Sequence, residues 1–183
     1  MLNGPVQEKP RLRFEPLDRK RHDRAAFSCE QELLDRYLKE RASQEIKKRV
    51  AAVYVLTPDG KTIAGYYTLS QYAIEAGELP PELIQQLHLP KYEKLPATLL
   101  GRLARSKQFK GRGLGELLLM GALKRALEHS RNIASVAVVV EAIDEGARAF
   151  YRQYGFIDIP NHPNRLFLPM KTVAHLFPDI DSE

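Results

Sequence analysis

The chain has 183 residues, the size of a single domain, and 44% of them are hydrophobic while 28% are charged, as in an ordinary packed globular protein. The apolar runs are far too short to cross a bilayer, the first residues contain no apolar stretch typical of a secretory signal, and the single cysteine excludes an intrachain disulfide. The net charge of +5 would draw the protein toward polyanions, although each basic cluster taken alone is more simply explained as solvated surface.

The first half of the chain predicts a helix followed by a hairpin. Four apolar residues between Leu33 and Leu38 fall at helical spacing, and Thr57–Gly60 has the composition of a tight turn between two strand-like runs. Residues 1–10 are expected to form a loose leader within one domain over residues 1–183. The elements predicted here are a short strand around Leu12 and Phe14, helices over Gln31–Ala42 and Ala42–Lys48, strands over Ala51–Leu56 and Thr62–Tyr72, and a short helix over Pro80–Leu87.

The second half alternates strands and helices around a glycine-rich loop. Asp144 is a suitable N-cap for a helix through Tyr154, and Gly155 can end that helix in a left-handed conformation. The order of elements predicts an α/β protein with one mixed central sheet flanked by helices on both faces. The other elements predicted here are strands over Ala97–Ala104, Ser135–Glu141, Phe156–Ile159 and Arg165–Met170, and a helix over Glu116–Ser130.

The glycine-rich loop Lys110–Gly115 is a candidate phosphate site. It lies between a strand and a helix N-terminus, where free N–H groups and the helix dipole attract anions, and its glycines let the backbone approach a ligand. A nucleoside-triphosphate loop would end in Gly-Lys followed by Ser or Thr, and a dinucleotide loop would have a glycine or alanine in place of Glu116, so neither fits. The alternative is a loop that caps the helix and binds nothing.

Two motifs resemble those of the GNAT acetyltransferase family. Gln108–Gly113 has the pattern Gln-x-x-Gly-x-Gly of the family's acetyl-CoA motif, and Ala142–Phe156 resembles its closing motif A-x-N-x-x-A-x-x-F-Y-x-x-x-G-F. Asp144 stands where the family usually has an asparagine that hydrogen-bonds CoA. The two matches occur in the family's order, which is much more specific than either alone. The resemblance implies the GNAT acyl-CoA N-acyltransferase fold and an acetyl-CoA-dependent N-acetyltransferase.

The resemblance also implies how acetyl-CoA would bind. Two neighbouring parallel strands would splay, and the pantetheine arm would lie between them and pair with the backbone of Leu103–Arg105. A backbone N–H near Leu103 would polarise the thioester carbonyl. The implied cofactor-binding residues are Leu103, Ala104, Arg105, Gly111, Arg112, Gly113, Leu114, Gly115, Glu116 and Asp144.

Tyr151 lies where the family places its catalytic acid. A phenol with a pKa of about 10 is protonated at neutral pH and can donate to a departing thiolate. Packing beside Phe150 is the alternative. None of the five histidines lies within either motif, so no general base is evident. The α-amino group of an aminoacyl ester needs a base less than lysine does, because its pKa is below about 8. Cys29 is interpreted as a buried thiol.

Further stretches resemble the GNAT toxins of bacterial type II toxin–antitoxin systems. This resemblance implies acetylation of the α-amino group of aminoacyl-tRNA, which blocks translation, and a ribbon-helix-helix antitoxin as partner. It further implies a cytoplasmic homodimer that meets operator DNA only through the antitoxin complex and does not meet a membrane. The stretches that carry it are Phe27–Glu30, Leu34–Leu38, Gly65–Ser70, Leu89–Tyr92 and Leu100–Ala104.

Four basic residues are candidate tRNA contacts because they follow the first helix, which flanks the acceptor side in this fold. They are Arg41, Lys47, Lys48 and Arg49. Arg105, where the toxins have valine, is either a phosphate contact or a surface arginine. Two alternatives remain: a GNAT N-acetyltransferase acting on a small-molecule amine or a protein N-terminus, and a non-catalytic nucleic-acid-binding domain. The second explains the charge but not the two ordered motifs. No metal site is expected.

Overall fold

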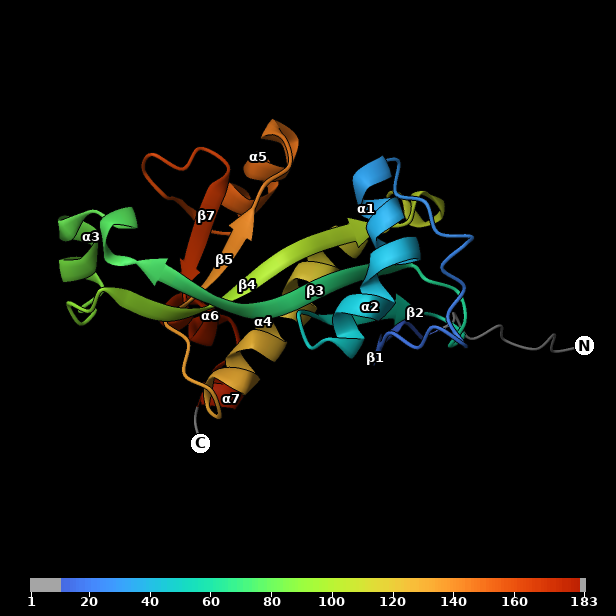
Figure 1. Cartoon of the computed structure of the whole chain (residues 1–183), viewed down its shortest axis with the longest axis horizontal. Coiled ribbons are helices and arrows are strands. Elements are labelled where there is room, and N and C mark those ends of the chain that lie inside the picture. The colour runs from blue at the N-terminus through green and yellow to red at the C-terminus, as the bar shows by residue number, and fades with distance from the viewer. Residues whose placement is uncertain (1–10, 182–183) are drawn as a thin grey trace, which may run out of the picture.

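A mixed sheet of seven strands, in the order β1-β2-β3-β4-β5-β7-β6, organises residues 11–181, the part of the chain that this computed structural model describes (Figure 1). The parallel pair is β4–β5, and every other neighbouring pair is antiparallel. The expected leader over residues 1–10 lies outside the described residues. The strands are β1 (Arg13–Pro16), β2 (Ala52–Thr57), β3 (Gly65–Glu75), β4 (Lys94–Arg105), β5 (Ala137–Glu141), β6 (Ile157–Asp158) and β7 (Arg165–Pro169).

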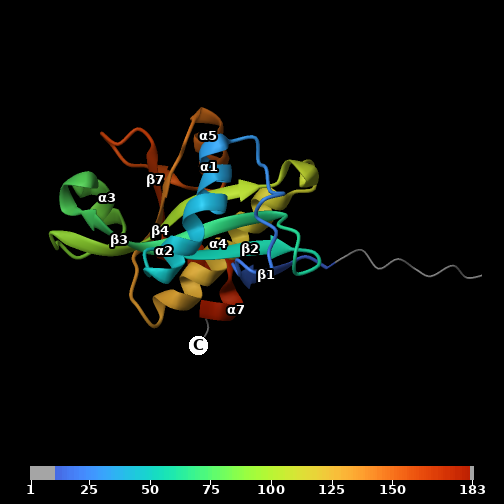
Figure 2. The ribbon, with the colours of Figure 1, turned by 45° about the vertical axis from the view of Figure 1, so that its right-hand side comes forward.

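Helices cover both faces of the sheet, as predicted. In Figures 1 and 2, α1 and α2 cross the front of the sheet, while α4 lies behind it. In chain order the helical segments are α1 (Glu32–Arg36), the π-turn η1 (Tyr37–Arg41), α2 (Ala42–Lys47), the 3-10 turn η2 (Ala76–Glu78), α3 (Pro81–Gln86), the 3-10 turn η3 (Lys107–Phe109), α4 (Leu114–Ser130), α5 (Glu145–Gln153), α6 (Met170–Leu176) and α7 (Pro178–Asp181).

Each face of the sheet has its own buried core. Behind it, Leu118 and Leu123 of α4 pack in one cluster with Tyr151 and residues of α6. In front, Tyr37 and Leu38 of η1 pack in another, and the β3 and β4 ends on that side are covered by α1–η1–α2. The alternation of β3 explains this division, because Tyr66 belongs to the front cluster and Tyr67 to the back one. The fold therefore places the two clusters on opposite sides of the same strand ends.

The expected strands and helices are confirmed, with informative differences at their ends. The two helices expected over 31–48 form one continuous rod that contains a π-turn. Strand β3 begins at Gly65 instead of Thr62, because the Asp59 carboxylate accepts hydrogen bonds from the amides of Lys61 and Thr62 and holds them in the turn. The C-terminal helices α6 and α7 were not predicted. Among residues 11–181, none of the helices is both long and apolar enough to cross a membrane.

Candidate functional site

Strands β4 and β5 separate halfway along their length. They pair only where Thr98–Leu100 faces Val138–Val140. The register between β3 and β4 shifts at the next residue, because Thr68 pairs with Arg102 while Leu69 pairs with Leu100, so Gly101 is an extra residue in β4. Such a bulge bends the strand that carries it. Beyond Gly101, β4 keeps β3 as its partner and has no strand on its other side among the described residues.

This free edge presents backbone groups of alternate residues. The amide of Ser106 donates to the Ala64 carbonyl at 2.8 Å, toward β3. Because N–H directions alternate along a strand, the backbone of Ala104 also faces β3, and those of Leu103 and Arg105 face the open side. Ala104 instead contributes a buried side chain to the front cluster. The edge can thus pair with an extended amide-bearing ligand, through two of the three residues expected to do so.

The glycine-rich loop leads from this edge into α4. Gly111 and Gly113 have left-handed φ angles of +78° and +71°, and a Cβ at either position would meet nothing within 4 Å. Gly113 is the N-cap of α4, and the first helical bond runs from Leu117 N to Gly113 O at 3.2 Å. The amides of Leu114, Gly115 and Glu116 therefore precede the first bond of the helix. An open surface with unbonded amides fits a pyrophosphate.

The start of α4 packs closely against α5. A Cβ at Gly115 would lie 3.7 Å from the Phe150 ring, and the buried Leu114 side chain turns into the core. Leu114 can therefore offer only its backbone to a ligand. Desolvation, followed by the charge of Glu116, raises the pKa of the Tyr154 phenol, so Glu116 lies next to α5. Two of the expected cofactor residues, Gly115 and Glu116, thus adjoin the helix that carries Tyr151.

The side chain of Tyr151 is buried, but its hydroxyl makes no hydrogen bond within the described residues. It is 6% exposed, and its ring lies 5.4 Å from that of Phe150 and 5.3 Å from that of Phe156. Among residues 11–181 no group is hydrogen-bonded to this hydroxyl. Desolvation raises the pKa of Tyr151 above its ordinary value, which favours the protonated phenol. Tyr151 packs in one cluster with Leu100 and Ala142. Leu100 is the last residue of β4 that pairs with β5, and Ala142 is the first residue after β5. A neutral donor therefore stands near the splay.

Asp144 has a structural task at the end of β5. Its carboxylate accepts a hydrogen bond of 2.7 Å from the Ala147 amide and caps α5, as predicted. An asparagine side-chain oxygen could make the same bond. The aspartate therefore preserves the cap where the family usually has asparagine, with one added negative charge beside the splay.

A cleft of about 530 Å³ opens on the side of the splay opposite the glycine-rich loop. Sequence reasoning did not assign a role to the group formed by Tyr37 and Arg102, which line the cleft, and Glu45, which adjoins Tyr37. The Arg102 guanidinium lies 3.5 Å from the centre of the Tyr37 ring, and the Tyr37 hydroxyl donates to Glu45 at 2.7 Å. The sequence contains little indication of this group, because its three residues come from different elements: η1, α2 and β4. The cleft is lined by Leu33, Leu34, Arg36, Tyr37, Arg41, Leu99, Gly101, Arg102, Glu141, Ala142, Ile143 and Asn164.

No histidine lines this cleft. Cys29 is also a poor nucleophile. Desolvation and the nearby Asp35 raise the pKa of the Cys29 thiol to about 12, so the thiol stays protonated. Within the described part of the chain, no group of three or more His, Cys, Asp or Glu side chains could hold a metal ion. The groups that the site offers for chemistry include the Tyr151 phenol and the free backbone amides at the edge of β4 and the start of α4.

The four expected tRNA contacts do not form one patch. Arg41 ends η1 and lines the cleft, while Lys47, Lys48 and Arg49 are exposed at the far end of α2. Arg49 lines a separate hollow beside Val50. Arg105 is partly buried at the end of β4. The structure thus brings the expected cofactor residues near Tyr151, and spreads the four expected tRNA contacts along one helical rod.

Comparison with known proteins gives matches over nearly the whole chain. The family model described as "Acetyltransferase (GNAT) family" matches residues 18–156. A protein of Sinorhizobium fredii named "Probable toxin TacT" is 32% identical over 171 residues, which cover 89% of this chain and 93% of that protein. A "tRNA-acetylating toxin" of Mycobacterium tuberculosis is also 32% identical, over 86% of this chain and 92% of its own length.

Solved structures give matches of similar extent. AtaT complexed with acetyl-methionyl-tRNAfMet is 29% identical with a TM-score of 0.82, over 91% of this chain and 99% of that one. A mutant AtaT bound to the C-terminus of the antitoxin AtaR and acetyl-CoA is 26% identical with a TM-score of 0.77, over 92% and 99%. The KacTA–DNA complex contains a chain that is 31% identical with a TM-score of 0.77, over 92% and 99%.

Proposed function

Because this chain belongs to the acetyltransferase (GNAT) family, we propose that it transfers acetyl from acetyl-CoA to the α-amino group of aminoacyl-tRNA and blocks translation as a toxin. The observation that carries the proposal is the free edge of β4 near the buried Tyr151, whose hydroxyl has no hydrogen-bond partner among the described residues. Relatives named for tRNA acetylation, at 32% identity over most of both chains, support this substrate over a small amine.

Acetyl-CoA supplies the activated acetyl group as a thioester. The backbone of Leu103 and Arg105 would hold the pantetheine arm, and the amides at the start of α4 would hold the pyrophosphate. The neutral α-amine attacks the thioester carbonyl, whose oxygen the Leu103 amide stabilises as charge develops. The C–N bond forms, the C–S bond breaks, and Tyr151 gives its proton to sulfur. The amine loses one proton to solvent, and Tyr151 regains one.

The rod α1–η1–α2 would guide the tRNA. Its Arg41 faces the cleft beside the splay, and Lys47, Lys48 and Arg49 extend the positive charge along the rod. Contacts of this kind attract and orient a phosphate backbone without reading its sequence. The ester lowers the pKa of the α-amine, which explains how the site could work without a histidine base.

A toxin of this kind needs partners. We expect a ribbon-helix-helix antitoxin to bind the protein and to link it to operator DNA, because a solved relative is bound to an antitoxin C-terminus and another lies in a complex with DNA. We also expect a homodimer that acts in the cytoplasm, where charged tRNA is found. These expectations rest on the relatives and on the proposed substrate.

The test is transfer of labelled acetyl from acetyl-CoA to a panel of charged tRNAs. We expect one or a few charged tRNAs to be labelled on the amino acid, and no labelling of the same tRNAs after deacylation. Polyamines and peptides with free N-termini serve as competing acceptors. Faster transfer to those acceptors than to any charged tRNA would contradict the proposal and favour an ordinary GNAT enzyme.

A further inference from the structure

A basic pocket on the other side of the helical rod takes no part in the transfer described above. Its volume is about 340 Å³, and it is lined by Arg19, His22, Asp23, Arg24, Ala25 and Lys39. We infer that this pocket binds a backbone phosphate of the RNA substrate, an inference that rests on the proposed function. The pocket would give a function to part of the basic run at Arg11–Arg24, which takes part neither in the proposed cofactor site nor in proton transfer from Tyr151.

The rod itself holds Arg24 in place. Its Nη1 donates to the carbonyl oxygens of Leu38 and Lys39, at 3.4 and 3.2 Å, and to Ser43 Oγ at 3.0 Å. A π-turn interrupts the regular helical bonding and leaves carbonyl groups in need of other donors. Among the described residues, no acceptor is bonded to Nη2 or Nε of Arg24. These donors of a fixed guanidinium remain for a ligand.

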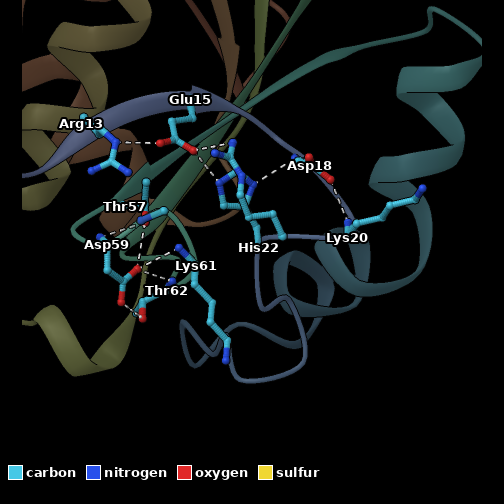
Figure 3. A network of polar contacts seen from close by, with 11 residues as sticks. Arg13, Glu15, Asp18, Lys20, His22, Thr57, Asp59, Lys61 and Thr62 are labelled. Carbon is cyan, nitrogen blue, oxygen red and sulfur yellow. Dashed lines mark hydrogen bonds and ion pairs between the residues drawn. The ribbon is translucent and has the colours of Figure 1, made fainter.

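Hydrogen bonds of the buried His22 to Asp18 and Glu15 hold the loop that carries Arg19 and Arg24 in place (Figure 3). His22 is 3% exposed, and its Nδ1 accepts from the Asp18 amide at 2.9 Å. The proton therefore lies on Nε2, which donates to Glu15 Oε2 at 2.9 Å. Hydrogen bonds from Arg13 and His22 lower the pKa of Glu15, so the acceptor stays charged. A rigid loop loses little conformational entropy when it binds.

The charges of the pocket select an anion. Arg19, Arg24 and Lys39 face a single carboxylate, that of Asp23, whose Oδ1 accepts from the Ala26 amide at 3.2 Å. The carboxylate is therefore directed to its own loop. Guanidinium groups match the oxygens of a phosphate, and two guanidinium groups with one ammonium exceed what a carboxylate ligand would need.

The surroundings favour a polymer over a free phosphate. Lys39, Ser43 and Lys47 recur every fourth residue, so they share one side of the rod and span about 12 Å. The pocket thus continues into the basic end of α2. Tyr37 and Arg41, on the opposite side of the same rod, line the cleft. A strand whose end enters the cleft could therefore cross the rod and place a phosphate in the pocket.

The test removes the two exposed cations and leaves Arg24 to support the rod. In an Arg19→Gln/Lys39→Gln protein, the plot of log affinity for charged tRNA against log salt should become shallower by about 0.7–0.9 units, because the contact with one phosphate is lost. Acetyl-CoA affinity and thermal melting should be unchanged. Lys91→Gln/Lys171→Gln removes two exposed charges elsewhere and should leave the slope as in the wild type.

Three outcomes would overturn the proposal that this pocket binds phosphate. They are an equal change of slope in the two double variants, no change of slope in either, and a shallower slope in Arg19→Lys/Lys39→Arg, which keeps both charges and should behave as the wild type. A wild-type protein that acetylates charged tRNA while the pocket variant keeps its slope would reject the pocket alone. A wild-type protein that neither binds nor acetylates charged tRNA would reject the proposed function together with it.

Discussion

The two sides of the splay are built by different means. On the cofactor side, backbone amides, two left-handed glycines and one neutral phenol form the site, and most of it lies within residues 99–156. On the proposed RNA side, side chains from β1, the following loop, η1, α2 and β4 hold one another through ion pairs, cation–π contacts and hydrogen bonds. A backbone site tolerates change outside its few glycines, whereas a side-chain site depends on partners far apart in sequence. Mutations should therefore affect the two sides in different ways.

The largest effect should come from Tyr151→Phe. The ring and its contacts with Phe150 and Phe156 remain, and the hydroxyl that is lost has no hydrogen-bond partner among the described residues. Loss of a positioned general acid costs about 100- to 10,000-fold in rate. Single-turnover transfer to charged tRNA at saturating acetyl-CoA measures it. Melting temperature and acetyl-CoA affinity should stay at wild-type values.

Tyr154→Phe is the matched control, because Tyr154 lies on the same helix end and its ring is 5.1 Å from Phe150. We expect it to transfer acetyl at close to the wild-type rate. If Tyr151→Phe is as fast as this control, Tyr151 is a core residue and the acid lies elsewhere.

Charge reversal at Lys47, Lys48 and Arg49 should weaken tRNA binding by roughly 10- to 100-fold at moderate salt and leave acetyl-CoA binding intact. All three side chains are exposed, so the fold should not change. The salt dependence should become shallower by about one unit for each contact that is lost. Binding of charged tRNA between low and moderate salt measures both. An unchanged slope would make the cluster plain solvated surface.

On the cofactor side, Gly113→Val should weaken acetyl-CoA binding by about tenfold. The Cβ would meet nothing within 4 Å, so the effect must come from the left-handed φ of +71°, which costs about 1–2 kcal/mol in any L-residue. The loop would move to relieve this strain and lose its alignment with the pyrophosphate. Calorimetric titration with acetyl-CoA measures the change, and wild-type affinity in the folded variant would reject the loop as the phosphate site.

The difference between the two sides also explains what could be predicted from the sequence. The glycine pattern, the Asp144 cap and Tyr151 could be found because each acts through local backbone geometry. The Arg102–Tyr37–Glu45 group could not, since its members are brought together only by the packing of η1 and α2 on β4. Spacing along the chain contains no record of such contacts.

The predicted ends of some strands and helices were wrong for similar reasons. The prediction began β4 at Ala97, but the strand extends back to Lys94. Pro96 is tolerated because its backbone faces away from β3: its carbonyl accepts from Val136 at 2.8 Å, and the ladder with β5 begins only at Thr98. The π-turn between α1 and α2 was not foreseen, because Arg24, from a distant loop, supplies the donors for its carbonyl groups.

Acid should loosen the side-chain region before the backbone site. Hydrogen bonds from the Lys61 amide and from Thr62 lower the pKa of Asp59 to about 2, from an ordinary value of 3.8. The unfolded chain therefore binds the proton more tightly, and the stabilisation is present above about pH 4 and lost as the pH falls toward 2. Screening of this exposed group limits it to about 1 kcal/mol.

The Asp59 turn supports the basic loop, because the Lys61 carbonyl accepts from the Asp23 amide at 2.8 Å. Asp59→Asn should lower stability by about 1 kcal/mol at pH 7 and flatten its dependence between pH 4 and 2. Urea unfolding at several pH values measures this. A variant whose stability follows pH as steeply as the wild type would show that other carboxylates dominate.

The smallest effect, and the one that separates charge from backbone, concerns Arg49. This residue has a left-handed φ of +58° and ends α2 in a Schellman motif, in which the Val50 amide donates to Glu45 O at 2.9 Å and the Arg49 amide donates to Ile46 O at 3.1 Å. Glycine is preferred at that position. Arg49→Gly should therefore raise stability by about 0.5 kcal/mol, after the greater freedom of glycine in the unfolded chain is subtracted.

Lys48→Gly is its matched control, because Lys48 is right-handed at φ −83° and glycine there should lower stability by roughly 0.5–1 kcal/mol. Each variant removes one positive charge, so both should make the salt dependence of tRNA binding shallower by about one unit. Urea unfolding and tRNA titration on the two proteins would then give opposite signs for stability and the same sign for binding. If both quantities instead change together in the two variants, the end of α2 acts on tRNA through its fold and not through its charge.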